Sequence, residues 1–213
     1  EFGIPTRVDN DVRCAALGEL NYGAGQGCDN LICITVGTGI GSGLVINGKL
    51  VRGASNAAGE IGHIKLDMNG GPLCGCGDRG CLEAFASGPS IVALAEEYIK
   101  GGKSTKYREL ANPDITPYIV SEAAKQGDPV AKRIFTIVGE YIGIGLASVV
   151  NLLNPEKIII GGGVAAAGDL LLTPIKESLI KRAMPIAGSA VEIVPAQLGN
   201  SAGVIGASLL INS

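Results

Sequence analysis

The stretch LICITVGTGIGSGLVINGKL, residues 31–50, decides the fold, because it reads as strands joined by a glycine loop and a hairpin. The runs LICITV (31–36) and GLVI (43–46) are apolar and rich in β-branched residues, as buried strands are. GTGIGS (37–42) separates them, and Asn47-Gly48 is a strong signal for a two-residue β-turn. The stretch therefore predicts strand, glycine loop, strand, hairpin and a third short strand.

Outside this stretch, helical and strand patterns alternate along the chain. Apolar spacing and end signals predict helices that begin at Asn10–Asp11 and that cover 89–100, 116–127, 129–153, 168–183 and 201–211. Ser87 is a candidate cap for the second of these helices. KIIIGGGV (157–164) and AVEIVPA (190–196) are typical of strands. This alternation predicts an α/β fold with a largely parallel sheet beyond the opening hairpin.

The composition bounds the class of protein. The chain has 213 residues, 46% of them hydrophobic, and a net charge of −3, which favours one globular domain or two small ones and disfavours nucleic acid as a partner. Six cysteines without a signal peptide favour reduced thiols or a metal, and a cytoplasmic location. Residues 134–153 are long enough for a membrane span, but Glu140 lies inside them, so a buried central helix is the preferred interpretation and no membrane partner is expected.

Two glycine-rich segments are candidate anion or nucleotide sites. VGTGIGSG (36–43) could turn several backbone N–H groups toward a phosphate, and a plain β-turn explains it equally well. A dinucleotide-binding GxGxxG and a Walker A motif both fail here, since no helix follows and Leu50 replaces the required Ser or Thr. GGG (161–163) follows a predicted parallel strand, where ligands of open α/β sheets bind, although a strand-to-helix turn would also suffice.

The segment PLCGCGDRGCLE (72–83) holds candidate metal ligands. Cys74, Cys76 and Cys81, with His63 upstream as the single histidine, make a complete Cys₃His set for tetrahedral zinc. Gly75, Gly77 and Gly80 would let the backbone fold tightly enough for the sulfurs to converge. Because no ligand position stays open, the zinc is predicted to be structural, in preference to a redox thiol cluster.

Carboxylates close in the sequence to segment 72–83, called the knuckle below, are candidates for ligand binding. Glu60, Asp67 and Glu83 bracket the metal set, and the second ring nitrogen of His63 could also hydrogen-bond a ligand. Asn10 and Asp11 stand where a helix begins, so spacing alone favours helix capping, with a general-base role for Asp11 as the alternative.

Taken together, four segments resemble the ROK family of bacterial sugar kinases and repressors. They are DNDVRCAALGE (9–19), VGTGIGSGLVINGKLVRGASNAAGEIGHIKL (36–66), CGCGDRGCLEAFASG (74–88) and LNPEKIIIGGGV (153–164). The resemblance implies an actin-like or hexokinase-like (ribonuclease H-like) ATPase fold that phosphorylates the 6-hydroxyl of a hexose, most of all glucose, with ATP and Mg²⁺. It also implies a homodimer or homotetramer.

The resemblance further implies roles for individual residues. Asp11 matches the catalytic base, and Asn10, Asp11, Glu60, His63 and Glu83 match the sugar ligands. His63, Cys74, Cys76 and Cys81 match the structural zinc set. Gly37, Thr38 and Gly39 match a phosphate-binding motif, and Gly161, Gly162 and Gly163 match a nucleotide-contacting turn.

The sequence departs from the kinases of this family at one point. It contains no Asp-x-Gly-x-Thr phosphate motif, so residues 1–213 are expected to form the C-terminal lobe of a two-lobed kinase, inactive by itself. Residues 1–11 would lie near the hinge, and the helix at 201–213 would close toward the missing N-terminal lobe. A sugar-sensing repressor body without its helix-turn-helix is the alternative, and only then would nucleic acid be a partner.

Overall fold

The centre of the molecule is a mixed β-sheet, seen in a computed structural model that describes residue 3 and residues 6–111 and 114–211. Within these residues the strand order is β3-β2-β1-β4-β5. The strands are β1 (Leu31–Val36), β2 (Ile40–Ile46), β3 (Lys49–Leu50), β4 (Lys157–Gly161) and β5 (Glu192–Pro195). β2 runs antiparallel to β1 and β3, whereas β4 runs parallel to β1 and β5, so the predicted hairpin followed by a parallel sheet is confirmed.

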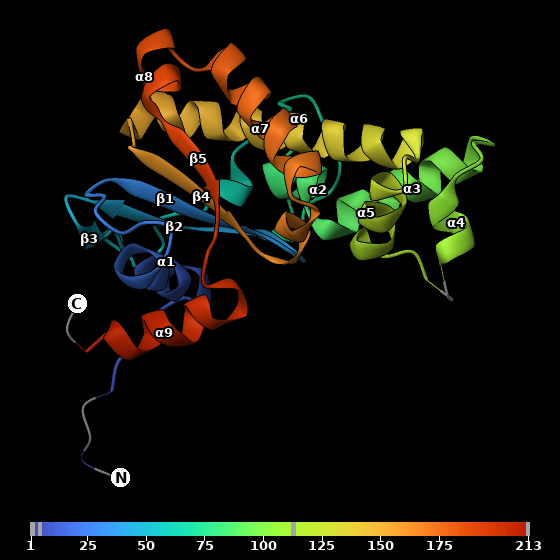
Figure 1. The fold of residues 1–213 in the computed structure, drawn as a ribbon. Coiled ribbons are helices and arrows are strands. Elements are labelled where there is room, and N and C mark those ends of the chain that lie inside the picture. The colour runs from blue at the N-terminus through green and yellow to red at the C-terminus, as the bar shows by residue number, and fades with distance from the viewer. Residues whose placement is uncertain (1–2, 4–5, 112–113, 212–213) are drawn as a thin grey trace.

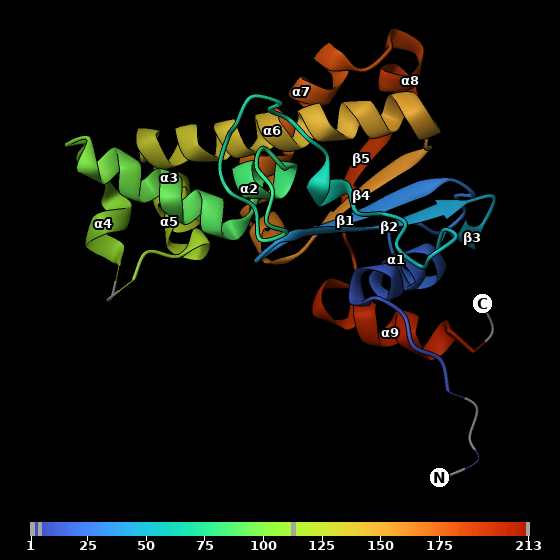
Figure 2. The ribbon, with the colours of Figure 1, turned by 180° about the vertical axis from the view of Figure 1, so that it is seen from behind.

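Helices cover both faces of the sheet, so the side chains of β1 are buried on both sides. Ile32, Ile34 and Val36 belong to the large core, and Leu31 and Cys33 belong to a second, smaller one. Figure 1 shows α1 (Asp11–Tyr22) and α9 (Ala202–Leu209) on the face of the smaller core, with α6 (Pro129–Leu153) and α7 (Asp169–Arg182) on the other face. The reverse view agrees (Figure 2). The fold is therefore a three-layer α/β arrangement.

Helix α6 is the one helix among the described residues that is long and apolar enough to span a membrane by length and composition. It nevertheless contributes twelve buried residues to the structure and packs along α7. Gly139 lies against Pro174, and Gly143 lies against Ser178, whose hydroxyl donates to the Glu140 carbonyl. The predicted buried central helix with small residues at its contact is confirmed.

Further short elements surround the ends of α6. Figure 1 shows α3 (Gly88–Lys100), α4 (Lys106–Leu110) and α5 (Pro117–Lys125) grouped at one end of α6, beyond the sheet. The remaining elements are α2 (Leu82–Ala86), α8 (Pro185–Ala190), and the 3₁₀ turns η1 (Ile61–His63), η2 (Gly163–Ala167) and η3 (Gly199–Ser201). Ser87 does precede α3, but its side chain makes no capping hydrogen bond.

The glycine loop is shorter than the sequence suggested. β2 begins at Ile40, which pairs with Val36, so the loop contains Gly37, Thr38 and Gly39 alone. Gly41 and Gly43 lie within β2, where a Cβ would collide with Val12 and Ala16 of α1. Half of the glycines in this segment therefore allow close packing of α1 instead of forming an anion cradle.

Candidate functional site

An open cleft of about 1010 Å³ lies at the carboxyl ends of β1, β4 and β5. In open α/β sheets this is the edge at which ligands bind. The cleft brings together every predicted catalytic, sugar-binding and nucleotide-contacting residue: Asn10, Asp11, Gly37, Thr38, Gly39, Glu60, His63, Glu83, Gly161, Gly162 and Gly163. These residues come from segments up to 153 positions apart, so the fold itself assembles the site.

Helix α1 presents Asn10 and Asp11 at one wall of the cleft. The Asn10 Oδ1 atom accepts from the N–H groups of Val12 (2.9 Å) and Arg13 (3.2 Å), which confirms the predicted N-cap. Asp11 Oδ1 accepts from the Val12 N–H at 2.9 Å, and Asp11 is exposed. Capping uses one oxygen of each side chain, so Asn10 Nδ2 and Asp11 Oδ2 can still meet a ligand.

The glutamates and the histidine line another part of the cleft. Glu60 is exposed at the start of η1, and His63 ends that turn. Glu83, in the first turn of α2, accepts from the Ile40 N–H at 2.8 Å through Oε2. A Cβ on Gly39 would collide with this carboxylate, so the glycine lets the β1–β2 turn approach Glu83. Asp67, the third expected carboxylate, is not among the residues that line the cleft; it accepts from the Asn69 N–H instead.

The two glycine turns form the end of the cleft nearest the sheet. The Gly37 N–H donates to the Gly39 carbonyl within its turn, so a bound anion would meet the rest of this loop. Gly162 has φ +87° and passes so close to the Val36 backbone that no Cβ would fit. Gly163 has open space around its Cα. Both explanations of these turns, tight packing and ligand contact, are therefore compatible with the geometry.

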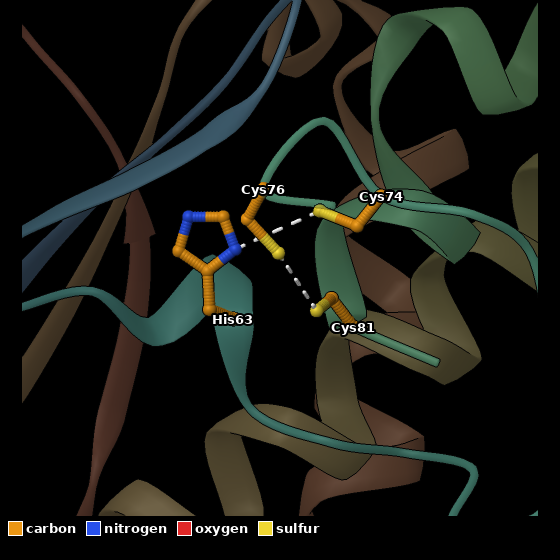
Figure 3. A group of neighbouring side chains, drawn as sticks. All are labelled: His63, Cys74, Cys76 and Cys81. Atoms are coloured by element: carbon orange, nitrogen blue, oxygen red, sulfur yellow. Dashed lines mark hydrogen bonds between the residues drawn. The ribbon is translucent and has the colours of Figure 1, made fainter. Parts of the chain in front are cut away.

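The predicted metal ligands converge into one cluster beside the cleft. The ligand atoms of His63, Cys74, Cys76 and Cys81 all lie within 4.8 Å of one another (Figure 3). Cys76 Sγ is 3.7 Å from Cys81 Sγ, and Cys74 Sγ is 3.6 Å from His63 Nδ1. A tetrahedral zinc ion would place two sulfurs about 3.8 Å apart, and a sulfur and a nitrogen about 3.6 Å apart. The residues present therefore fit a zinc ion, and Figure 3 shows the second His63 ring nitrogen on the far side of the ring from Cys74.

The backbone of the knuckle explains how the sulfurs meet. Gly77 and Gly80 have φ values of +91° and +76°, whereas Gly75 is not in the left-handed region, so only two of the three glycines expected to shape the turn have positive φ. Lys65 donates to Cys81 Sγ (3.2 Å) and pairs with Asp78, which brings a positive charge to the sulfurs. Burial raises the pKa of the Cys74 thiol to about 11, so a metal ion that binds the thiolate would have to displace this proton.

Sequence reasoning missed two parts of the site. One is the rim formed by Pro195, Ala196, Gly199 and Asn200, at the end of β5 and just after it. The other is an apolar groove of about 670 Å³ that shares Gly37, Thr38 and Gly163 with the cleft and is lined by Pro89, Val92, Ala93, Pro117, Tyr118 and Val164. The signal was the pair of proline helix starts at 89 and 117, whose convergence only the fold reveals.

Comparison with known proteins gives this arrangement a family. The profile of the ROK family matches residues 1–213. The glucokinase of Halalkalibacterium halodurans is 44% identical over 216 residues, which cover 99% of this chain and 64% of that protein. The chain thus spans less than two thirds of the length of this relative.

Solved structures give the same result for the fold. A ROK family glucokinase from Streptomyces griseus, in complex with glucose and AMPPNP, matches with a TM-score of 0.85 at 39% identity, over 98% of this chain and 69% of that one. A ROK family transcriptional regulator, a homologue of the E. coli MLC protein, matches with a TM-score of 0.90 at 33% identity, over 99% of this chain and 52% of that one. Because the family profile matches the chain over its whole length, the chain belongs to the ROK family.

Proposed function

We propose that the chain is the sugar-binding and catalytic-base half of an ATP-dependent kinase that phosphorylates the 6-hydroxyl of a hexose, with glucose as the preferred substrate. The observation that carries this proposal is the cleft, whose lining combines Asp11 with Glu60, His63 and Glu83 and with two glycine turns. The identity of 44% to a glucokinase supports the same reaction and sugar. A cytoplasmic enzyme follows from this function, and assembly as a homodimer or homotetramer stays a prediction.

Asp11 is the proposed general base. A sugar hydroxyl is a poor nucleophile, so a carboxylate must accept its proton as the oxygen attacks the γ-phosphoryl group. Asp11 Oδ1 is held by the Val12 N–H, which fixes the orientation of the carboxylate and leaves Oδ2 to take the proton. Asn10 would orient the same hydroxyl region through Nδ2, since its oxygen caps α1.

The glutamates and the histidine of the cleft would bind the remaining sugar hydroxyls. Carboxylates are strong acceptors for paired hydroxyls, and the exposed Glu60 is placed to bind in this way. Glu83 accepts from the Ile40 N–H through Oε2 and from the Cys74 thiol through Oε1 at 3.6 Å, so the sugar would use the remaining lone pairs of this carboxylate. His63 would use its second ring nitrogen, which lies on the side of the ring away from Cys74.

The nucleotide would occupy the other end of the cleft. Thr38, Gly39 and Gly163 would meet the phosphates, and the adjoining apolar groove has the size and lining for the nucleobase. Mg²⁺ bound with ATP would supply charge neutralisation at the phosphates. The groove joins the cleft at the glycine turns, which supports one continuous nucleotide site.

The Cys₃His cluster is proposed to hold a structural zinc ion. With four protein ligands the metal has no open coordination position, so it supplies rigidity and no reaction step. Its ligand His63 and its neighbour Glu83 both line the cleft. The knuckle would therefore hold the sugar-binding wall in place, where a small displacement costs much of the rate.

The second candidate is the body of a sugar-sensing repressor, which the likeness to a ROK transcriptional regulator favours. The two candidates differ in the segment that precedes this region. An Asp-x-Gly-x-Thr motif there would support a kinase, and a helix-turn-helix would support a repressor. We favour the kinase because the Asn10–Asp11 pair and the glycine turn line one cleft, and because a glucokinase is more similar in sequence than the regulator.

The test of the proposal is Asp11→Asn in a chain that also carries the phosphate-binding lobe. Loss of the general base should lower kcat for glucose phosphorylation by about 10²–10⁴-fold. Glucose affinity should change little, because Asn still forms hydrogen bonds. A coupled assay for glucose 6-phosphate and calorimetric titration with glucose measure the two effects.

Asp169→Asn is the matched control, because Asp169 is also an exposed acid at the first position of a helix, α7. It should leave kcat and glucose affinity unchanged. Near-normal kcat in Asp11→Asn would return Asp11 to helix capping alone and contradict the proposal.

A further inference from the structure

Asp9, next to the Asn10–Asp11 pair, is a buried carboxylate between two arginines. Its side chain is 4% exposed, and its Oδ1 accepts from Arg13 Nε while Oδ2 accepts from Arg52 Nε at 2.8 Å. Oδ1 also accepts from the Asn10 N–H at 2.8 Å. Both oxygens are thus committed inside the protein, and none of the proposed chemistry uses them.

The two arginines connect Asp9 to two parts of the chain that carry residues of the cleft. Arg13 is in the first turn of α1, two residues after Asp11, and its Nη1 donates to the Asn56 carbonyl at 2.8 Å. Arg52 follows β3, at the start of the segment 51–60 that ends at Glu60. Asp9 therefore joins the start of α1 to segment 51–60 through two separate contacts.

Segment 51–60 contains no helix or strand, so its position depends on such contacts. Apart from the Asp9 network, its ends are held by the Val51 N–H donating to the Leu44 carbonyl and by the Ser42 hydroxyl donating to the Gly59 carbonyl. Two turns inside the segment are closed by the Asn56 N–H donating to the Gly53 carbonyl and by the Ala58 N–H donating to the Arg52 carbonyl. The middle, around Asn56, is held by Arg13. An irregular segment outside the sheet and helices opens locally at lower free energy than they do, and charge-assisted hydrogen bonds to it are strong ones.

We propose that Asp9 is a positioning residue of the sugar site, whose carboxylate clamps segment 51–60 onto the start of α1 and so sets the spacing between Asp11 and Glu60. The inference rests on the proposed function, since it assigns those two residues to one sugar. A carboxylate is required because two guanidinium groups and one backbone N–H all donate to the same side chain. An amide at this position would turn an NH₂ group toward one of the donors.

The test is Asp9→Asn, with hydrogen exchange and kinetics measured on one preparation of the protein that carries the phosphate-binding lobe. Loss of a charge-assisted contact should speed amide exchange in peptides covering 51–60 by about tenfold or more. The KM for glucose should rise by a similar factor, while the KM for ATP stays unchanged. If Asp9→Asn fails to fold, Arg52→Gln takes its place in the test. Because the Arg52 side chain is 36% exposed, this variant should give a smaller effect of the same kind.

Asp128→Asn is the matched control, because Asp128 is a 2% exposed carboxylate that caps α6 and is not among the residues that line the cleft. It should lower the Tm without changing exchange in 51–60 or the KM for glucose. Unchanged exchange in 51–60, or a glucose KM that stays constant while kcat falls with the folded fraction, would overturn the proposal. A wild-type protein without kinase activity would count against the proposed function alone, and the exchange data would then decide the clamp.

Discussion

At the scale of the residue, Asn10 and Asp11 show how one position serves both structure and chemistry. Each side chain gives one oxygen to the first turn of α1 and keeps another polar atom toward the cleft. Spacing in the sequence favoured capping over catalysis, and the geometry removes the conflict between them. A cap also fixes the rotamer of the side chain, which is what a proposed base requires.

Asp9 gives a prediction for pH dependence. Burial alone would raise its pKa, but the Asn10 N–H, Arg52 and Arg13 together hold the pKa of this carboxyl below its ordinary value. A lowered pKa in the folded state stabilises the protein above the unfolded value of about 3.9, and this stability is lost as the pH falls through the folded value.

The free energy of unfolding of the wild type, minus that of Asp9→Asn, should therefore be largest near neutral pH and shrink below about pH 4. Urea titrations of both proteins between pH 7 and pH 3 measure the difference. A difference that stayed constant over this range would mean that Asp9 carries no extra charge stabilisation.

Glu19 is a residue whose role could not be predicted from the sequence. It sits inside α1 with no exposed surface, and its carboxylate accepts from the N–H groups of Ala24, Gln197 and Leu198. It thereby anchors the turn after β5, whose Gly199 and Asn200 form the missed rim of the cleft. The partners lie up to 179 positions away, and no local pattern encodes such a contact.

At the scale of the element, α9 packs on α1 through glycine. A Cβ on Gly206 would overlap the Cys14 carbonyl, and a Cβ on Gly18 would contact the Ala202 carbonyl. The expectation that the last helix faces another lobe remains a prediction, since these contacts lie within the chain itself.

Gly206→Ala should therefore push α9 away from α1 and lower the free energy of unfolding by about 1–3 kcal/mol, as overpacking does. Gly203→Ala, in the same helix, is the control, because its Cβ would meet only the Asp11 carbonyl at 3.9 Å. Thermal melts of both variants measure the effect. Equal Tm values for the two variants would show that the α1–α9 contact is loose.

The knuckle yields a prediction about metal. Protein washed with a weak chelator but still folded should retain about one equivalent of zinc, and Cys81→Ser should lose it, because its sulfur is one of four converging ligands. Cys28→Ser is the control, since Cys28 lies outside the cluster. Elemental analysis and thiol titration give the readout. Metal-free, folded wild-type protein with three reactive thiols in the knuckle would refute the zinc site.

The elements also show where sequence reasoning stops. The strands of 31–50 and the helices with proline starts and glycine ends were predicted, because apolar spacing and end signals are local. The short helices α2, α4 and α8 were not predicted, since each has only five or six residues and depends on tertiary packing. Gly41 was assigned to a loop, and Gly43 to a segment that could bind an anion, because their contacts with α1 are not encoded nearby.

At the scale of the whole molecule, the cleft follows from topology. The carboxyl ends of β1, β4 and β5 meet at one edge, so the turns that follow them are neighbours in space. Family motifs were enough to name the residues at the ends of β1 and β4, but not those at the end of β5. The apolar groove could not be predicted, since it arises where the starts of α3 and α5 meet the glycine turns.

The central claim is that this cleft is one half of a kinase site. The 213 residues contain no Asp-x-Gly-x-Thr motif, so the γ-phosphate would lack donors from a second lobe. Orientation of the reactants can supply about 7–11 kcal/mol of rate acceleration, which half a cleft cannot provide. The chain by itself is therefore predicted to be inactive.

The most direct measurement is a coupled assay for glucose 6-phosphate, with glucose and Mg-ATP, on two proteins. One is the 213-residue chain, and the other is the same chain joined to a preceding ROK lobe that carries Asp-x-Gly-x-Thr. The account predicts turnover by the joined protein and none above background by the chain alone. Comparable turnover per chain in both proteins, or no turnover in the joined protein, would contradict it.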